Sequence, residues 1–347
     1  MRPLTVAVVL LAAPVCAAAQ ASYPGAHWDT IAGSSAARWS VDSLRAIGRY
    51  VEALGSGAVV VIDGGRLVAQ WGEPARKFPL ASARKSLLNA LIGIEVGRGT
   101  IRTGATLASI GIDDDPPLTP AELEATVADL LRSRSGVYHA SAYEPASMES
   151  NRPARGSAKP GERWFYNNWD FNALGTIYER ASGKGIFDAF GSEIARPLGM
   201  EDYAPRDGEY VRESTSRHAA YTFRMSARDL ARFVLLYLRG GRWNDRQLVP
   251  AEWVAESTRG YSNAADGGAY AQLWWAAREG QLLPGVSLDS GTFAARGNGP
   301  HYAIAIPSRK LVIIHLANTD TPSPANWVER GDVGKLVARI LAARRPD

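Results

Sequence analysis

The sequence predicts an α+β fold, arranged as an α/β/α sandwich in which a mostly antiparallel sheet is flanked by helices and a helical lobe is inserted. The order of elements is the first observation: a helix and two strands, a helical middle, then successive strands and a closing helix. The second is the short spacing between strands, since strands at hairpin spacing pair antiparallel. The third is size, because 347 residues with 46% apolar side chains can bury one large core. We expect a single domain over 22–347, with the α/β part at about 38–98 and 265–347 and the helical lobe at about 99–264.

The individual elements are predicted from periodicity and turn residues. Residues 41–54 have the apolar spacing of an amphipathic helix, and the apolar runs 58–62 and 67–71 flank an Asp-Gly-Gly turn typical of a hairpin. A strongly helical run at 82–97 follows. The stretch 133–161 has no periodicity and many turn formers, which is typical of a loop that is either functional or disordered. The remaining expected helices are 120–131, 169–182, 186–196, 226–239, 250–257 and 327–344, and the expected strands are 270–276, 286–293, 301–306 and 311–317.

The N-terminus has the pattern of a secretory signal peptide over residues 1–21. Arg2 supplies a positive start, 5–15 is an apolar stretch, and the alanines at 17–21 offer a small-residue cleavage site. The apolar stretch is too short for a transmembrane helix, so no integral membrane segment is expected after signal removal. We therefore expect a bacterial protein that is periplasmic or secreted.

The single cysteine, Cys16, lies inside this expected signal peptide. A lipoprotein anchor would place a small residue before the cysteine, and Val15 argues against that alternative. A mature chain without cysteine can form neither disulfides nor thiolate ligands.

Charge and motif spacing exclude several functions. The net charge of +4 comes mainly from scattered arginines with no basic stripe, so no nucleic-acid partner is predicted. No His, Asp or Glu cluster has metal-ligand spacing, so we expect no metal and no cofactor. The five histidines lack a Gly-x-Ser-x-Gly elbow, which argues against a Ser-His triad.

The pair Ser82 and Lys85 is the most informative chemical feature of the chain. They lie three residues apart at the head of the run 82–97, and residues i and i+3 share one helix face, so Ser82 Oγ and Lys85 Nζ can meet. A buried lysine with a lowered pKa can take the proton of a serine and make it a nucleophile. The alternative is a helix-capping serine followed by a solvated lysine. The functional interpretation is acyl transfer through a covalent acyl-enzyme.

Tyr166 and Asn168 form a second candidate element just before the helix expected at 169–182. Two residues apart in an extended loop, they point the same way. A tyrosine can relay a proton between a nucleophile, a lysine and a leaving group, and an asparagine can donate to a substrate carbonyl. The alternative is an aromatic ring packed under a helix whose N-cap is Asn168.

These residues resemble the serine β-lactamase-related hydrolases, the group of class C β-lactamases, D-Ala-D-Ala carboxypeptidases, family VIII esterases and 6-aminohexanoate-dimer hydrolases. The resemblance covers nearly all of the chain from residue 41 onward. It implies Ser82 as nucleophile, Lys85 as its base and Tyr166 as proton relay, with Asn168 contacting the substrate carbonyl and Lys85. Its markers, in chain order, are 82–86 (SARKS), 130–137 (LLRSRSGV), 166–168 (YNN), 197–200 (PLGM), 226–233 (SARDLARF) and 273–275 (LWW).

The sequence departs from this family at the third motif, whose cation binds a substrate carboxylate. No Lys-Ser/Thr-Gly or His-x-Gly is present, and the matching strand places Ala295 where the cation should be. Arg296 points to the other face of a strand. His301 follows the next turn and is a candidate for contacting the substrate. The family pattern assigns the oxyanion hole to the backbone N–H groups of Ser82 and of Asn298, the residue after Gly297, and that hole needs no cation.

We therefore expect a secreted serine hydrolase that acts through a Ser82 acyl-enzyme on neutral short-acyl carboxylic esters or small linear amides. Alternatives are a β-lactamase or D-amino-acid-directed carboxypeptidase, or a catalytically weak penicillin-recognising module that only binds a ligand. The expected partner is a small-molecule ester, amide or β-lactam-like substrate, and the sequence predicts no oligomeric state. Trp274, Trp275, Tyr138, Tyr143 and His139 are further candidates for lining the site, with core or surface roles as the alternative.

Overall fold

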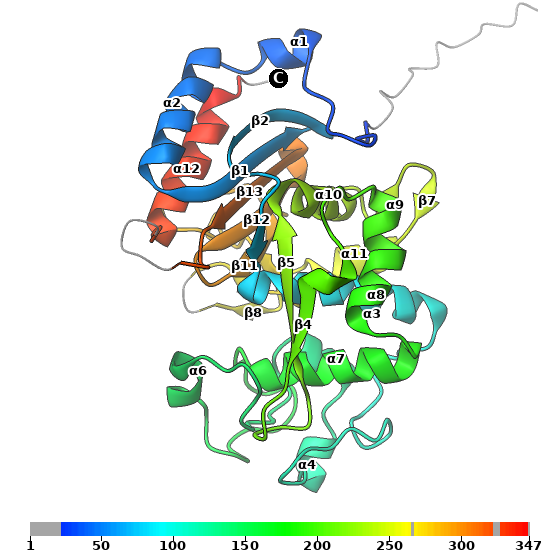
Figure 1. Ribbon diagram of the computed structural model, residues 1–347. Coiled ribbons are helices and arrows are strands. Elements are labelled where there is room, and N and C mark those ends of the chain that lie inside the picture. The colour runs from blue at the N-terminus through cyan, green and yellow to red at the C-terminus, as the bar shows by residue number, and fades with distance from the viewer. Residues whose placement is uncertain (1–21, 265–266, 322–326, 346–347) are drawn as a thin grey trace, which may run out of the picture.

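An eight-stranded antiparallel sheet forms the centre of the computed structural model, which describes residues 22–264, 267–321 and 327–345 (Figure 1). The strand order is β2-β1-β13-β12-β11-β10-β9-β8, so the N-terminal hairpin pairs directly with the last strand of the chain. All neighbouring strands pair antiparallel, as predicted. The expected signal peptide at 1–21 lies outside the described residues. The strands of this sheet are β1 (Ser56–Asp63), β2 (Arg66–Gly72), β8 (Ser262–Asn263), β9 (Ala269–Tyr270), β10 (Trp275–Ala276), β11 (Phe293–Gly297), β12 (His301–Ile306) and β13 (Leu311–Ala317).

Helices cover both faces of this sheet. Helices α2 (Val41–Ala53) and α12 (Arg330–Ala343) lie side by side on one face, and α10 (Ala227–Leu238) packs on β1, β12 and β13 from the other (Figure 1). The alternation along β1 explains the layering: Val59 and Val61 belong to the core under α2 and α12, whereas Val60 and Ile62 belong to the core on the other face. The predicted α/β/α sandwich is confirmed.

Helix α3 (Arg84–Arg98) runs through the larger core and carries the residues of interest at its start. All its residues from Arg84 to Glu95 are buried, and it contacts α7 (Asn168–Ser182), α8 (Ile186–Phe190), α11 (Ala251–Ser257) and β11. A helix buried on every side is held by its surroundings rather than by an amphipathic pattern. Its first residues are therefore placed rigidly between the sheet and α7.

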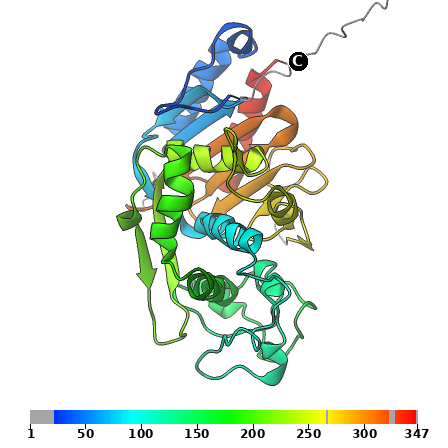
Figure 2. The ribbon, with the colours of Figure 1, turned by 90° about the vertical axis from the view of Figure 1, so that its right-hand side faces the viewer.

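The remaining elements are divided between the surroundings of the main sheet, where α1 and η4 lie, and the side of α3 that is away from it, where α4 and α6 lie. Figures 1 and 2 show α4, α6 and α7 extending from the sheet as a separate layer of the molecule. These remaining elements are α1 (Gly33–Ala37), α4 (Pro120–Leu123), α5 (Val127–Leu131), α6 (Ala146–Ser150), α9 (Arg196–Leu198), the π turn η2 (Gly191–Ala195), the 3₁₀ turns η1 (Ala81–Ala83), η3 (Pro205–Asp207) and η4 (Pro307–Arg309), the small sheet β3 (Lys77–Pro79), β5 (Ala220–Ser226) and β4 (Gly208–Val211), and the hairpin β6 (Arg242–Trp243) and β7 (Arg246–Gln247).

Several predicted elements differ in detail. The helix expected at 120–131 is two short helices, because Thr126 forms a capping box that begins α5. The strand expected at 270–276 is two short strands, β9 and β10, around a turn where Leu273 has a φ of +60°. The strand expected at 286–293 begins only at Phe293. Helix α10 falls in the stretch expected for the helical lobe, yet it packs on the main sheet.

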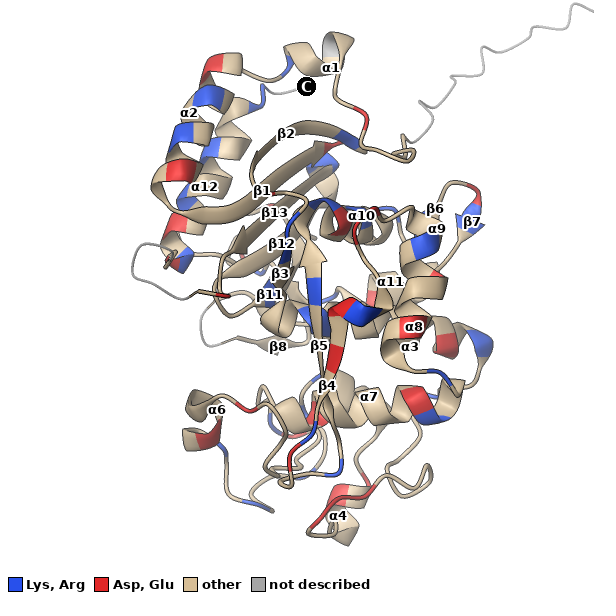
Figure 3. Cartoon of the chain, in the orientation of Figure 1, with Lys and Arg blue, Asp and Glu red and all other residues tan. Residues whose placement is uncertain are grey.

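Acidic and basic residues are interspersed along the same elements, as α2 and α12 show (Figure 3). Within the described ranges, no helix is both long and apolar enough to cross a bilayer.

Candidate active site

Ser82 lies in the 3₁₀ turn η1, which joins the small sheet to α3. Strand β3 pairs with β5, and the Leu80 amide donates to the Phe223 carbonyl at 2.9 Å, so the turn is fixed on its approach side. Ala81, directly before the serine, has a φ of +46°, a strained conformation for a residue with a side chain. Strain of this kind persists only where the surroundings hold it, and it is common at functional sites.

Lys85 Nζ lies between the two hydroxyl groups that the sequence pairs with it. It is 2.8 Å from Ser82 Oγ and 2.9 Å from Tyr166 OH. The ammonium position is also 4.6 Å from the centre of the Tyr166 ring and 4.4 Å from that of Phe171. Lys85 is 2% exposed, and among the described residues it forms no ion pair with a carboxylate. The structure therefore brings Ser82, Lys85 and Tyr166 together as expected.

The electrostatics of this group favour a neutral lysine and a neutral tyrosine. Burial, reinforced by the charge of Arg84, lowers the pKa of Lys85 well below its ordinary value. Burial raises the pKa of Tyr166, and the Ser82 hydrogen bond and the charges of Arg84 and Arg296 offset part of this increase. At neutral pH the amine can accept the proton of Ser82 while the phenol still has one to donate.

Tyr166 is positioned by the first turn of α7. Asn167 is the N-cap: its Oδ1 accepts from the Trp169 amide at 3.1 Å, and its Nδ2 donates to the Val137 carbonyl at 2.6 Å. The Phe165 amide donates to the Ser133 carbonyl, so the segment is tied to the long loop on both sides of the tyrosine. The cap is thus Asn167, one residue before the Asn168 that the alternative interpretation named.

Asn168 lies next to this group but is oriented differently from the expectation. Its Nδ2 donates to the Tyr143 carbonyl at 2.9 Å rather than to a group at Lys85. Its Oδ1 is buried without a hydrogen-bond partner among the described residues. The expected Asn168–Lys85 contact is therefore not formed, because the long loop supplies a competing backbone acceptor.

Gly297, at the end of β11, lies directly against the turn that carries Ser82. A Cβ at this position would be 2.4 Å from the Leu80 carbonyl oxygen and 3.3 Å from the Ala83 amide nitrogen. Asn298 follows at the surface, and its backbone N–H donates to no backbone carbonyl within the described part of the chain. The two segments expected to supply the oxyanion hole are therefore in contact.

The residues around the missing cation are placed by the sheet register. Ala295 is fully buried in the core, so no charge reaches the site from that position. His301 is fully buried too: its Nδ1 accepts from the Ala317 amide, and burial together with His315 lowers its pKa to about 3. The structure packs this neutral imidazole against Gly297 and Gly299 and does not bring it to the surface of the site.

Aromatic rings line the other side of Tyr166. The Tyr166 ring centre is 5.6 Å from those of Tyr270 and Trp275, and the Arg296 guanidinium lies 4.0 Å from the Trp275 ring centre. Trp275 therefore lies at the site, whereas Trp274 is fully buried and stacks on Phe233. Of the two neighbouring tryptophans, only Trp275 contacts the predicted catalytic residues.

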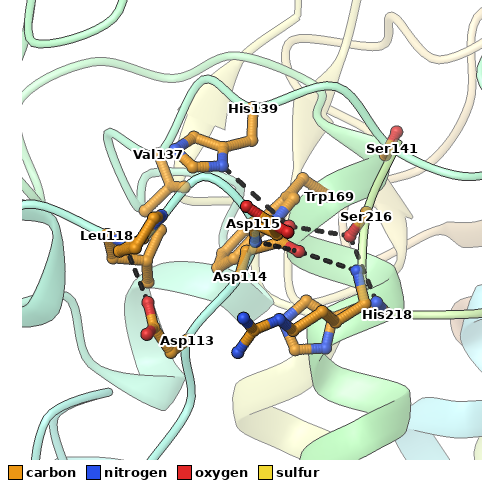
Figure 4. Close-up of polar contacts among 12 residues, drawn as sticks. Asp113, Asp114, Asp115, Leu118, Val137, His139, Ser141, Trp169, Ser216 and His218 are labelled. Atoms are coloured by element: carbon orange, nitrogen blue, oxygen red, sulfur yellow. Dashed lines mark hydrogen bonds and ion pairs between the residues drawn. The ribbon is translucent and has the colours of Figure 1, made fainter. Parts of the chain in front are cut away.

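A second buried polar cluster holds the start of α7 in place (Figure 4). The Asp114 carboxylate accepts from Trp169 Nε1 at 2.6 Å, from Ser216 Oγ at 2.7 Å and from the Arg217 amide at 2.7 Å. His139 is buried beside it, with Nδ1 3.9 Å from Asp114 Oδ2, so it neither lines the site nor lies at the surface. This cluster ties two distant loops to the helix turn that follows Tyr166.

Arg84 is a residue that the sequence analysis did not single out. It lies inside the Ser82–Lys85 motif, is 2% exposed, and its charge acts on both Lys85 and Tyr166. The available signal was a charged residue at the start of a helix whose next turns are almost entirely apolar. Within the described residues, no group of three or more His, Cys, Asp or Glu side chains could hold a metal ion.

Comparisons with known proteins point to one family. The Beta-lactamase family model matches residues 45–333. The D-alanyl-D-alanine-carboxypeptidase/endopeptidase AmpH of Escherichia coli (strain K12) is 28% identical over 193 residues, 46% of this chain and 49% of that protein. The match thus spans about half the length of this curated relative.

Solved structures share the fold at low sequence identity. A Bacillus anthracis protein provisionally named a 6-aminohexanoate-dimer hydrolase has a TM-score of 0.63 and 19% identity, covering 85% of this chain and 80% of its own. A class C β-lactamase mutant has a TM-score of 0.61 and 14% identity, covering 87% and 97%. Because the family model matches most of the chain and the fold agrees, this chain belongs to the β-lactamase family of serine hydrolases.

Proposed function

We propose that this protein hydrolyses carboxylic esters or small linear amides through an acyl-enzyme on Ser82. The observation that carries the proposal is the position of Lys85 Nζ, 2.8 Å from Ser82 Oγ and 2.9 Å from Tyr166 OH. These distances are within the range for direct proton transfer, and the lowered pKa of Lys85 leaves the amine free to accept a proton at neutral pH.

The reaction follows from this arrangement. Lys85 Nζ takes the proton of Ser82 as Oγ attacks the substrate carbonyl, and the backbone N–H groups of Ser82 and Asn298 stabilise the oxyanion. Tyr166 gives its proton to the leaving alcohol or amine, and Lys85 returns a proton to Tyr166. Deacylation reverses these steps with water in place of the leaving group, so both active-site groups regain their starting protonation states.

The fully buried Ala295 supports esters or linear amides over β-lactams and D-Ala-D-Ala peptides. A cation on that strand would bind the carboxylate of the latter substrates, and this chain has none there. The similarity to AmpH favours the alternative of a D-amino-acid-directed carboxypeptidase, because the name of that relative describes such an activity. The alternative of a binding module without catalysis is disfavoured, because Lys85 is held within hydrogen-bond distance of both Ser82 and Tyr166.

A labelling experiment and one substrate panel test the proposal. A fluorophosphonate probe is expected to modify the native protein on Ser82 and to leave Ser82→Ala unmodified. The panel compares p-nitrophenyl acetate and butyrate with nitrocefin, a D-Ala-D-Ala peptide and a linear amide oligomer. Hydrolysis of nitrocefin without hydrolysis of either ester would overturn the substrate assignment, and absence of labelling under conditions that modify an authentic esterase would overturn the acyl-enzyme.

We also propose that the protein is exported, on the signal-like pattern of residues 1–21. Expression of the full chain in a bacterium, followed by mass measurement of the periplasmic form, is expected to show cleavage near residue 21. A full-length product confined to the cytoplasm would contradict export.

A further inference from the structure

Arg84 is a buried cation without a counter-ion, next to the predicted nucleophile. Its Nη1 donates to the Ala81 carbonyl at 2.8 Å. Its Nε and Nη2 are buried without a hydrogen-bond partner, and none of the ion pairs among the described residues includes Arg84. Burying an unpaired charge is costly, so such a group calls for a partner.

The contrast with Arg232 shows that this fold can give a buried guanidinium a counter-ion and partners for both of its Nη atoms, although the Nε of Arg232 is also unbonded. Arg232 is fully buried, yet its guanidinium donates to the carbonyls of Gly25, Leu198 and Ala26 and to the Glu201 carboxylate. Arg84 has one carbonyl and the faces of two tyrosine rings, with the guanidinium carbon 5.3 Å from the Tyr143 ring centre and 5.4 Å from that of Tyr221. Cation–π contacts offset part of the desolvation, but they leave the Nε and Nη2 hydrogens unbonded.

The unbonded atoms have the geometry that a carboxylate requires. Nε and Nη2 form one edge of the planar guanidinium, and this edge binds the two oxygens of a carboxylate through parallel hydrogen bonds. Tyr221 contributes a second buried donor, since its OH has no partner among the described residues. Tyr143, which is 47% exposed, lies against the guanidinium, with its ring centre 5.3 Å from the guanidinium carbon.

We propose that the Nε–Nη2 edge of Arg84, with the Tyr221 hydroxyl, binds a carboxylate group of the substrate beneath Tyr143. The inference rests on the proposed function and names the substrate class more closely: esters or amides that carry an anionic group. It also replaces the neutral esters expected from the sequence alone, because Arg84 in the first motif would supply the cation that the third motif lacks at Ala295. The buried Ala295 then disfavours only substrates whose carboxylate must bind on β11. Binding forms hydrogen bonds only, and no covalent step is added.

Two matched ester pairs test the proposal and locate the anion. In the first pair, 4-nitrophenyl butyrate and mono-4-nitrophenyl succinate differ at the end of the acyl chain. In the second, phenyl acetate and 4-carboxyphenyl acetate differ on the leaving group. Wild-type protein is expected to prefer the anionic member of at least one pair about tenfold or more in kcat/KM, and Arg84→Gln to bring that ratio close to one, mostly through KM.

The ratio within a pair separates recognition from catalysis. Arg84→Gln also changes the charge beside Lys85 and the support of Ala81, and the part of these effects that is common to both members of a pair cancels in the ratio. Arg84→Lys is expected to give an intermediate ratio, since it keeps the charge without the fork, and Tyr221→Phe a partial loss. Arg296→Gln is the matched control, a nearby arginine whose replacement is expected to leave the ratio within about threefold.

A second measurement does not depend on turnover of these esters. Succinate is expected to slow fluorophosphonate labelling of wild-type Ser82 and not that of Arg84→Gln, with folding of each variant checked by thermal melting. Unlabelled wild-type protein would refute the acyl-enzyme itself. Labelled protein in which Arg84→Gln changes neither the ester ratios nor the succinate effect, or in which Arg296→Gln abolishes them instead, would overturn the carboxylate site alone.

Discussion

Replacing Gly297 by alanine tests whether the contact between β11 and the η1 turn controls the position of Ser82. The new Cβ would be 2.4 Å from the Leu80 carbonyl oxygen, 3.2 Å from His301 Cδ2 and 3.3 Å from the Ala83 amide nitrogen. Two of these neighbours are backbone atoms on either side of the nucleophile, so no flexible side chain can move away to relieve the contact.

The size of the displacement follows from these distances. Ordinary van der Waals contact begins at 3.4 Å, so the Leu80 carbonyl and the end of β11 must separate by about 1 Å. A misplacement of this size in a catalytic site costs roughly 100-fold in rate. The overpacking itself costs about 1–3 kcal/mol of folding free energy, which a domain with about 5–15 kcal/mol tolerates.

We expect Gly297→Ala to fold, with urea unfolding showing a modest loss of stability, and to lower kcat/KM for p-nitrophenyl acetate by about two orders of magnitude. Gly104→Ala is the matched control, because Gly104 has open space around its Cα and ordinary backbone angles. A Gly297→Ala protein with kcat/KM within threefold of wild type would refute the assignment of this contact to the active site.

Three further predictions follow from the same site and its supports. Ser82→Ala is expected to abolish turnover, and Lys85→Ala and Tyr166→Phe to lower kcat by about 10²–10⁴-fold with little change in melting temperature, whereas wild-type turnover in Ser82→Ala would end the assignment. The value of kcat/KM is expected to fall at acid pH as Lys85 gains a proton. Arg84→Gln is expected to move this fall to higher pH, because the variant loses the charge repulsion that helps to lower the pKa of Lys85. An unchanged acid limb would contradict this role of Arg84. His218 has a pKa of about 4 in the folded protein and about 6.5 in the unfolded chain. Between these values the unfolded chain binds more protons, so the free energy of unfolding is expected to fall as the pH is lowered from about 6.5 to 4. Melting temperatures that stay constant from pH 7.5 to 5 would be inconsistent with this.

The fold was largely predictable because its sheet is built from strongly patterned segments. The apolar runs of β1, β12 and β13 and the helix α2 could be assigned from periodicity alone. The small sheet of β3, β5 and β4 was not predicted, because β3 and β4 are very short and β3 pairs with β5 from a distant part of the chain.

The site was predictable to the extent that its chemistry is encoded by local spacing. Ser82 and Lys85 lie three residues apart, and Tyr166 directly precedes a capped helix, so their meeting required only the expected fold. The burial of His301 and the orientation of Asn168 depend on neighbours from β13 and the long loop, which sequence spacing does not specify. The same reason concealed Arg84, whose partners Tyr143 and Tyr221 come from two distant segments.

The position of Arg84 also links substrate recognition to the strength of the base. Its charge disfavours a proton on Lys85, and among the described residues no carboxylate pairs with Arg84 or with Lys85. A carboxylate held on the free edge of Arg84 would cancel part of this repulsion, because an anion beside the guanidinium reduces its field at the amine. Lys85 would then become a stronger base when an anionic substrate is bound, while remaining unprotonated in the free enzyme. The same residue would in this way both select the substrate and increase the basicity needed to activate Ser82.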